Sequence, residues 1–352
     1  MQNNIEIKKL ENSEIELSGE IPSEVFEQSR KSVIKNLSKD LSIPGFRKGH
    51  IPEDIVVKHI GEAEILNKMA ERTLRKTYPD MLAENKIDAI GQPEIIVTKI
   101  AAGNPLGFKI KVATMPEITL PDYKSIAKKI FSAKENIVVE KKEIEDMINE
   151  IRKNRLAMEK SKNTQGALTQ NSADTKEPEL PLLDDTFIKT LGDFKDVADF
   201  KQKIEANLLK EKEVRAKDKK RMGTVEQIIL GSKIDIPNIL VEGELDRMLA
   251  HFTGNVEQSG GTLDDYLKYA KKTVEELRKE WRPDATKRAK TQLILNKIAL
   301  DEKISASKEK IEEEVEKLMK HYPSADPLRS RGYVEMILTN DAVFAFLEEQ
   351  AS

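Results

Sequence analysis

The sequence predicts an α+β chain, in which a small α+β domain at the N-terminus is followed by an elongated, all-helical region. Two patterns predict this class. Within residues 1–115, segments that alternate apolar and polar residues flank segments of helical periodicity, and from Asp184 onward every apolar stripe has the helical period. The composition agrees, because charged residues make up 34% and aromatic residues only 5% of the chain. Long solvated helices with thin cores fit these values better than one large globule does.

Length and composition also exclude several classes of protein. At 352 residues the chain has room for two or three domains. The net charge of -3 is not that of a nucleic-acid-binding chain, so any RNA contact must be local. The absence of cysteine excludes disulfides, thiolate metal sites and a cysteine nucleophile. The first residues lack the features of a signal peptide, and no apolar run has the length of a membrane span, so we expect a cytoplasmic protein without membrane contact.

The elements of the N-terminal domain follow from periodicity and turn residues. They are a hairpin over residues 5–20, a helix from Pro22 to Asp40, a helical region over 53–84 with a break at Gly61, and strands over 93–100 and 106–112. The first helix has an apolar face and an opposite face with four cations, Arg30, Lys31, Lys35 and Lys39. One interpretation is that these cations, near the loop that follows the helix, extend its positive field. The alternative, favoured for each lysine taken singly, is an ordinary solvated face.

That loop, residues 43–52, reads Ile-Pro-Gly-Phe-Arg-Lys-Gly-His-Ile-Pro. Its two prolines disfavour helix, and Gly45 and Gly49 tolerate backbone angles that a side chain resists. We therefore expect an exposed loop with Phe46, Arg47 and Lys48 at its tip. The two cations suit phosphate or carboxylate, and the ring suits an apolar pocket or a base face. From composition alone, an ordinary connection between two helices remains the alternative.

The loop resembles the ribosome-docking signature of the trigger factor family, the bacterial chaperones that meet nascent chains at the ribosomal tunnel exit. The resemblance implies that Phe46, Arg47 and Lys48 make the ribosome contact and that Gly45 and Gly49 shape the loop. His50 stands where the family often has lysine, so one positive charge is missing at pH 7. Residues 90–93 and 115–118 also resemble the family, so the similarity spans a ribosome-binding domain over residues 1–115.

The next part of the chain departs from the family. We expect a connector and linker helix over 116–160, extended as far as 134 and helical from 138, and then a flexible linker over 161–181. Trigger factors usually carry an FKBP-like prolyl isomerase domain here, with an aromatic pocket. Residues 135–180 contain no Phe, Tyr, Trp or His, and the segment from Leu180 resembles the sequence that follows that domain. We therefore expect the isomerase to be replaced by the linker and the chain not to be an enzyme.

Residues 182–352 predict a helical chaperone domain, which resembles the family's C-terminal domain with its arms and cradle. Helix boundaries are expected at Pro237, at a Thr262 cap, at a capping box from Thr273 to Glu276 and at Ser307, with a kink at Pro283. The candidate client-binding side chains are Met248, Phe252, Phe344 and Phe346. Core packing on the helical stripes is the alternative for such residues.

The predicted function is that of an ATP-independent holding chaperone. Its expected partners are the ribosome, through protein and rRNA near the tunnel exit, and unfolded nascent polypeptides, while a homodimer stays open. We expect no cofactor and no metal, because the four histidines are scattered and no phosphate-binding loop or nucleophile motif occurs. Two alternatives remain: a residual prolyl isomerase, and a ribosome-independent chaperone or assembly factor. The net acidity disfavours an unrelated nucleic-acid binder.

Overall fold

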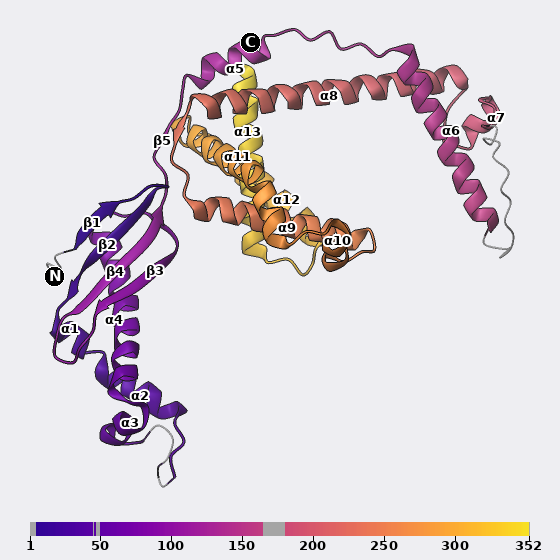
Figure 1. Ribbon diagram of the computed structural model, residues 1–352. Coiled ribbons are helices and arrows are strands. Elements are labelled where there is room, and N and C mark those ends of the chain that lie inside the picture. Colours follow the sequence, from indigo (N-terminus) through magenta and orange to yellow (C-terminus); the bar gives the residue numbers. More distant parts are fainter. Residues whose placement is uncertain (1–4, 45, 47–49, 165–179, 352) are drawn as a thin grey trace. The chain divides into compact units, whose positions relative to one another are not determined.

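A computed structural model of the chain describes residues 5–44, 46, 50–164 and 180–351, without the side chains of 159–164. The described chain divides into two compact units, Met1–Pro121 with Gly231–Ile304, and Asp122–Leu230 with Ser305–Ser352. As the sequence predicts, strands are concentrated in the N-terminal part and the rest is mainly helical (Figure 1). No helix in the described part of the chain has the length and hydropathy needed to cross a membrane.

The N-terminal domain is built on a four-stranded antiparallel sheet of order β1-β2-β4-β3. Its strands are β1 (Glu6–Lys9), β2 (Glu14–Ile21), β3 (Ala89–Lys99) and β4 (Leu106–Thr114). The predicted hairpin is the pair β1–β2. Leu17 of β2 lies opposite Ile110 of β4, and both side chains are buried. One face of the sheet therefore contributes its side chains to the hydrophobic core.

Four helices complete this domain: α1 (Ser23–Glu27), α2 (Arg30–Asp40), α3 (Glu53–Ile60) and α4 (Glu62–Glu84). Figure 1 shows α4 running along the sheet, with α2 and α3 at one of its ends. The side chains of Phe26, Ile65, Met69 and Leu74 join those of the sheet in one apolar core. Gly61 separates α3 from α4 with a φ of 91°, as its position in the sequence predicts.

Two expectations for this part of the chain are wrong. The helix predicted over Pro22–Asp40 is two helices, and the break lies where the Ser29 hydroxyl meets that of Thr73 on α4, at 2.7 Å. The connector over 116–134 is not extended throughout, because it contains helix α5 (Tyr123–Phe131). Asp122 caps α5 by accepting a hydrogen bond from the Ser125 amide, and α5 packs on the last helix of the chain.

The remaining helices of the first unit are α9 (Asn238–Gln258), α10 (Leu263–Ala270) and α11 (Val274–Asp301). The predicted Thr262 cap and the capping box of Thr273 with Glu276 are both present. Pro283 lies inside α11, which remains one helix. A small core holds α9 to α11, and Glu242 accepts hydrogen bonds from Arg278 and Arg282 across the pair. Strands β5 (Ile118–Thr119) and β6 (Lys233–Ile234) pair near the start of α9.

The second unit consists of helices. Besides α5 they are α6 (Lys141–Thr164), α7 (Asp185–Lys189), α8 (Val197–Gly231), α12 (Lys308–His321) and α13 (Pro327–Glu349). A core of Ile148, Ile188 and Phe200 joins α6, α7 and α8. Ser307 caps α12, as the sequence predicts. Of the linker predicted over 161–181, the first four residues continue α6, and 165–179 lie outside the described residues.

Candidate functional site

The candidate docking loop connects α2 to α3. Its N-terminal part turns at Ile43, whose carbonyl accepts a hydrogen bond from the Phe46 amide at 3.1 Å. Its C-terminal part is anchored by Ile51, which is buried in the domain core. Between these points the Phe46 side chain is 41% exposed, so an apolar ring faces solvent. Gly45, Arg47, Lys48 and Gly49, which the sequence also predicts for this site, lie outside the described residues.

Arg30 joins the three helices around this loop. Its Nε donates to Glu53 on α3 at 3.0 Å, and its two terminal nitrogens donate to the two carboxylate oxygens of Glu62 on α4 at 2.5 and 3.0 Å. The hydrogen bond from Arg30 lowers the pKa of Glu62, and the same bond raises the pKa of Arg30. The expectation that Arg30 adds to a free positive field is therefore wrong, because the carboxylates of Glu53 and Glu62 neutralise its charge. We call the group of Arg30, Glu53 and Glu62 the Arg30 clamp.

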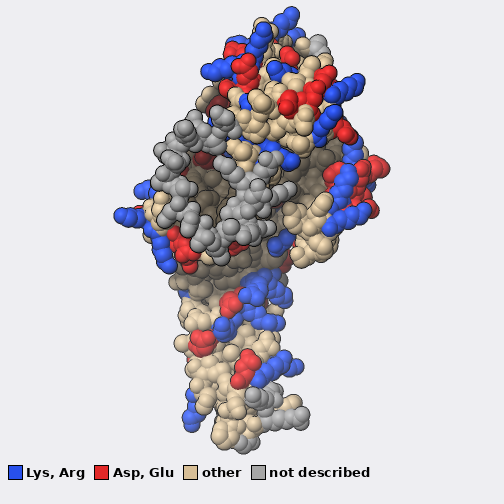
Figure 2. Space-filling view, turned by 90° about the vertical axis from the view of Figure 1, so that its right-hand side faces the viewer, with Lys and Arg blue, Asp and Glu red and all other residues tan. Residues whose placement is uncertain are grey.

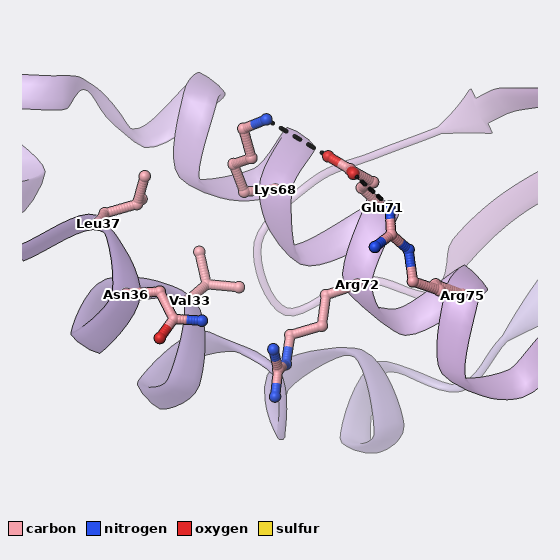
Figure 3. Close-up of a pocket in the computed structure, with 7 residues that line it drawn as sticks. All are labelled: Val33, Asn36, Leu37, Lys68, Glu71, Arg72 and Arg75. Carbon is pink, nitrogen blue, oxygen red and sulfur yellow. Dashed lines mark hydrogen bonds and ion pairs between the residues drawn. The ribbon is translucent and has the colours of Figure 1, made fainter. Parts of the chain in front are cut away.

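Further cations line a cleft of about 250 Å³ between α2 and α4 (Figure 3). Lys68 and Arg75 both pair with Glu71, at 3.3 and 3.1 Å, while Val33 faces them from α2. Arg72 has no ion-pair partner among the residues that the structure describes. Figure 2 shows Lys and Arg side chains interspersed with Asp and Glu side chains on the lower part of the view. Sequence reasoning missed this group, because helical cations usually indicate only a solvated face.

Two of the predicted client-binding residues, Met248 and Phe252, lie on α9 and are half-buried. Met248 packs against the small core of α9 and α11. The Phe252 ring makes edge-to-face contacts with Tyr266 and Trp281, with ring centroids 4.8 and 5.4 Å apart. The exposed edge of this aromatic cluster leaves part of its apolar surface in contact with solvent.

The other two predicted residues, Phe344 and Phe346, lie on α13 and are also half-buried. The guanidinium of Arg221 on α8 lies 5.1 Å from the centre of the Phe344 ring. The ammonium of Lys124 on α5 lies 5.5 Å from the centre of the Phe346 ring. Each ring thus has a cation over it, which stabilises its position within the protein.

The sequence did not single out a larger apolar cleft between α12 and α13. It has a volume of about 530 Å³ and is lined by apolar side chains that include Leu318, Tyr322, Tyr333 and Ile337. Three of these, Tyr322, Tyr333 and Ile337, are exposed. No group of His, Asp and Glu that could hold a metal ion occurs among the described residues.

Two models of one protein family match this chain, one over its N-terminal part and one over its C-terminal part. Residues 3–151 match the family model described as bacterial trigger factor protein, and residues 196–351 match the model of its C-terminus. This chain belongs to the trigger factor family. Trigger factors are chaperones, so membership assigns the chain a chaperone role in protein folding.

Similar proteins support the assignment over the whole length. A trigger factor of Agathobacter rectalis is 26% identical, with 92% of this chain and 89% of that protein covered. One from Clostridium botulinum strain Hall is 24% identical, with 99% of each covered. A solved structure, described as "Promiscuous Substrate Recognition in Folding and Assembly Activities of the Trigger Factor Chaperone", has a TM-score of 0.54 at 16% identity, with 99% of this chain and all of that chain covered. This chain therefore has the trigger factor fold.

Proposed function

We propose that this chain docks on the ribosome through the loop at Phe46 and shields apolar segments of nascent polypeptides. The observation that carries the proposal is the exposed Phe46 ring on a loop whose flanking helices are joined by the Arg30 clamp. A ring held on such a base loses little conformational freedom on binding. Arg47 and Lys48 follow it in the sequence and would add contacts to phosphate or carboxylate groups of the ribosome.

The shielding part of the proposal is supported by apolar surface on the C-terminal helices. The α12–α13 cleft offers two tyrosine rings and aliphatic side chains beside charged residues. Burial of roughly 400 Å² of client apolar surface contributes on the order of 10 kcal/mol before ordering costs are subtracted. The net affinity is then low enough for clients to leave without a nucleotide-driven step. Met248, Phe252, Phe344 and Phe346 would add contacts through their exposed parts.

We also propose that the chain has no prolyl isomerase activity. Residues 152–195 are matched by neither family model. The alignment with the Clostridium botulinum relative spans 426 positions, whereas this chain has 352 residues, so at least 74 positions face a gap in this chain. Residues 135–180 also lack every aromatic residue and histidine. A proline-binding pocket needs apolar and aromatic walls, which this segment does not supply.

Co-sedimentation with ribosomes tests the docking proposal. We expect the Phe46→Ala/Arg47→Ala/Lys48→Ala variant to lose most ribosome binding. The control Lys268→Ala/Lys271→Ala, which removes two exposed lysines at the end of α10, should keep most of it. Wild-type binding should weaken with salt only modestly, because few charges take part. Undiminished binding of the loop variant would contradict the proposal. Wild-type chain that is absent from ribosome fractions but prevents aggregation would indicate a ribosome-independent chaperone or assembly factor.

The isomerase proposal is tested by the refolding of a client whose slow step is proline isomerisation. We expect the chain to leave the rate of that step unchanged at concentrations where it suppresses aggregation of the same client. A rate that rises in proportion to the chain's concentration would show that an isomerase site remains.

A further inference from the structure

The core face of the N-terminal sheet is left open along β3. Ile95 and Val97 on β3 lie opposite Ile110 and Phe108 on β4, so all four side chains point to the same face. The two residues of β4 are 0% and 1% exposed, whereas Ile95 and Val97 are 40% and 37% exposed. The apolar face of the sheet therefore continues beyond the area that the helices cover.

A pocket of about 550 Å³ lies over this open face, between β3 and α4. Its apolar lining consists of Leu74 and Tyr78 from α4 and Pro93, Ile95 and Val97 from β3. The Tyr78 hydroxyl is buried and has no hydrogen-bond partner in the described part of the chain. The pocket shares Glu71 and Arg75 with the α2–α4 cleft, but none of its apolar lining residues.

The strand beside this pocket is also the edge of the sheet, since β3 ends the order β1-β2-β4-β3. Irregularities between Ile90 and Glu94 and between Val97 and Lys99 interrupt its register. Such bulges, with Pro93, protect an edge strand from pairing over its full length. They leave Glu94–Val97 as a short regular segment with one side of its backbone unpaired within the sheet.

We propose that Glu94–Val97 and the β3–α4 pocket bind a short extended peptide, which adds a strand to the sheet edge. Strand addition uses backbone hydrogen bonds for affinity and every second side chain for selection. The ligand would therefore be a segment of about four residues with small aliphatic side chains at alternate positions, directed into the pocket. The inference rests on the proposed shielding of unfolded polypeptides, and it adds a client contact in the N-terminal domain, apart from the helical region.

Photo-cross-linking on the full chain tests the site. The probe is a soluble peptide of alternating valine and threonine that carries a photo-reactive group, and the comparison peptide has the same composition with its valines grouped. Mass spectrometry measures the fraction of adducts that fall on residues 74–97. We expect adducts there with the alternating peptide, reduced about tenfold in Ile95→Glu/Val97→Glu because charge replaces the apolar lining. The matched control Ile96→Glu, whose side chain is 53% exposed on the opposite face, should keep them.

The outcomes separate this site from the proposed function. Adducts confined to the helices after residue 182 overturn the site and leave the holding function intact. Equal losses in Ile95→Glu/Val97→Glu and Ile96→Glu overturn it too, because they would indicate general damage to the domain. A third outcome is that no adducts form, that sedimentation shows a dimer of the wild type, and that this dimer dissociates in Ile95→Glu/Val97→Glu. The edge strand β3 would then pair with a second copy of the chain, which also overturns the peptide site. Failure to suppress client aggregation would count against the holding function itself.

Discussion

Arg30 and Glu62 form a two-bonded ion pair across 32 residues of sequence, with the candidate docking loop between them. The guanidinium fork matches the two carboxylate oxygens, and a third bond reaches Glu53 on α3. One side chain thus fixes α2 against both helices that follow the loop. The geometry of the loop's base is therefore set by a planar, multiply bonded cation, which lysine cannot replace.

The first prediction concerns Arg30→Lys. Lysine keeps the charge but loses the fork, so we expect the N-terminal domain to lose about 1 kcal/mol of local stability, a modest value because the carboxylates are partly solvated. Amide hydrogen exchange in Glu53–Ile60 should quicken several-fold, and ribosome binding should weaken with it. The matched control Lys68→Gln removes an exposed ion pair with Glu71 and should change the exchange of Glu53–Ile60 little. Unchanged exchange in Arg30→Lys would show that the clamp is not needed.

The second prediction concerns the titration of Glu62. Hydrogen bonding from Arg30 lowers its pKa from the ordinary value of 4.5. A lowered pKa in the folded state means that the clamp's contribution is fully present above pH 4.5 and is lost as the pH falls through the folded-state pKa. In Arg30→Met the Glu62 pKa should return toward its ordinary value. NMR of the side-chain carboxyl carbons in selectively labelled protein measures the pKa of Glu62 in the wild type and in Arg30→Met. Equal pKa values in the two proteins would contradict the attribution of the lowered pKa to Arg30.

Much of the fold follows from local sequence signals. The break at Gly61, the Thr262 cap and the Thr273–Glu276 capping box are each fixed by residues within four positions of one another. Helix α5 could also have been found, because Asp122 is a good cap and Ser125 supplies the amide it accepts from. Pro116 and Pro121, which both precede that segment, favour an extended chain, and the extended interpretation was carried on too far, to residue 134.

The candidate site was only partly predictable. Phe46 follows from its loop string, but the partners of Arg30 lie 23 and 32 residues further on and depend on how three helices pack. The exposed β3 residues were predicted as strand, yet their lack of cover depends on where α4 ends its contact with the sheet. Such long-range relationships are absent from local periodicity, which is why the clamp and the β3–α4 pocket appear only in three dimensions.

The third prediction uses the single tryptophan of the chain. Thr273→Ala removes the side chain that accepts from the Glu276 amide and should cost the start of α11 about 1 kcal/mol. Trp281 lies two turns further along this helix and against Phe252, so its fluorescence reports the change in unfolding midpoint. Ser307→Ala removes an equivalent cap from α12 in the other compact unit and should leave that signal unchanged. Equal responses of the two variants would contradict the local role of the capping box.

The last prediction concerns Tyr78→Phe. Because the Tyr78 hydroxyl is buried without a partner, its removal should leave local stability unchanged or raise it by up to about 1 kcal/mol. Burial also raises the pKa of this tyrosine above 10.0, so wild-type stability should fall at alkaline pH as the pH rises through the folded-state pKa, and the variant should lack this contribution. Hydrogen exchange in Glu62–Glu84 at neutral pH measures the first effect, and denaturant unfolding at a series of alkaline pH values measures the second. For comparison, Leu74→Ala should lower the stability of the domain by about 2–5 kcal/mol, because it opens a cavity beside the same ring. A clear loss of protection in Tyr78→Phe would mean that the hydroxyl has a partner after all.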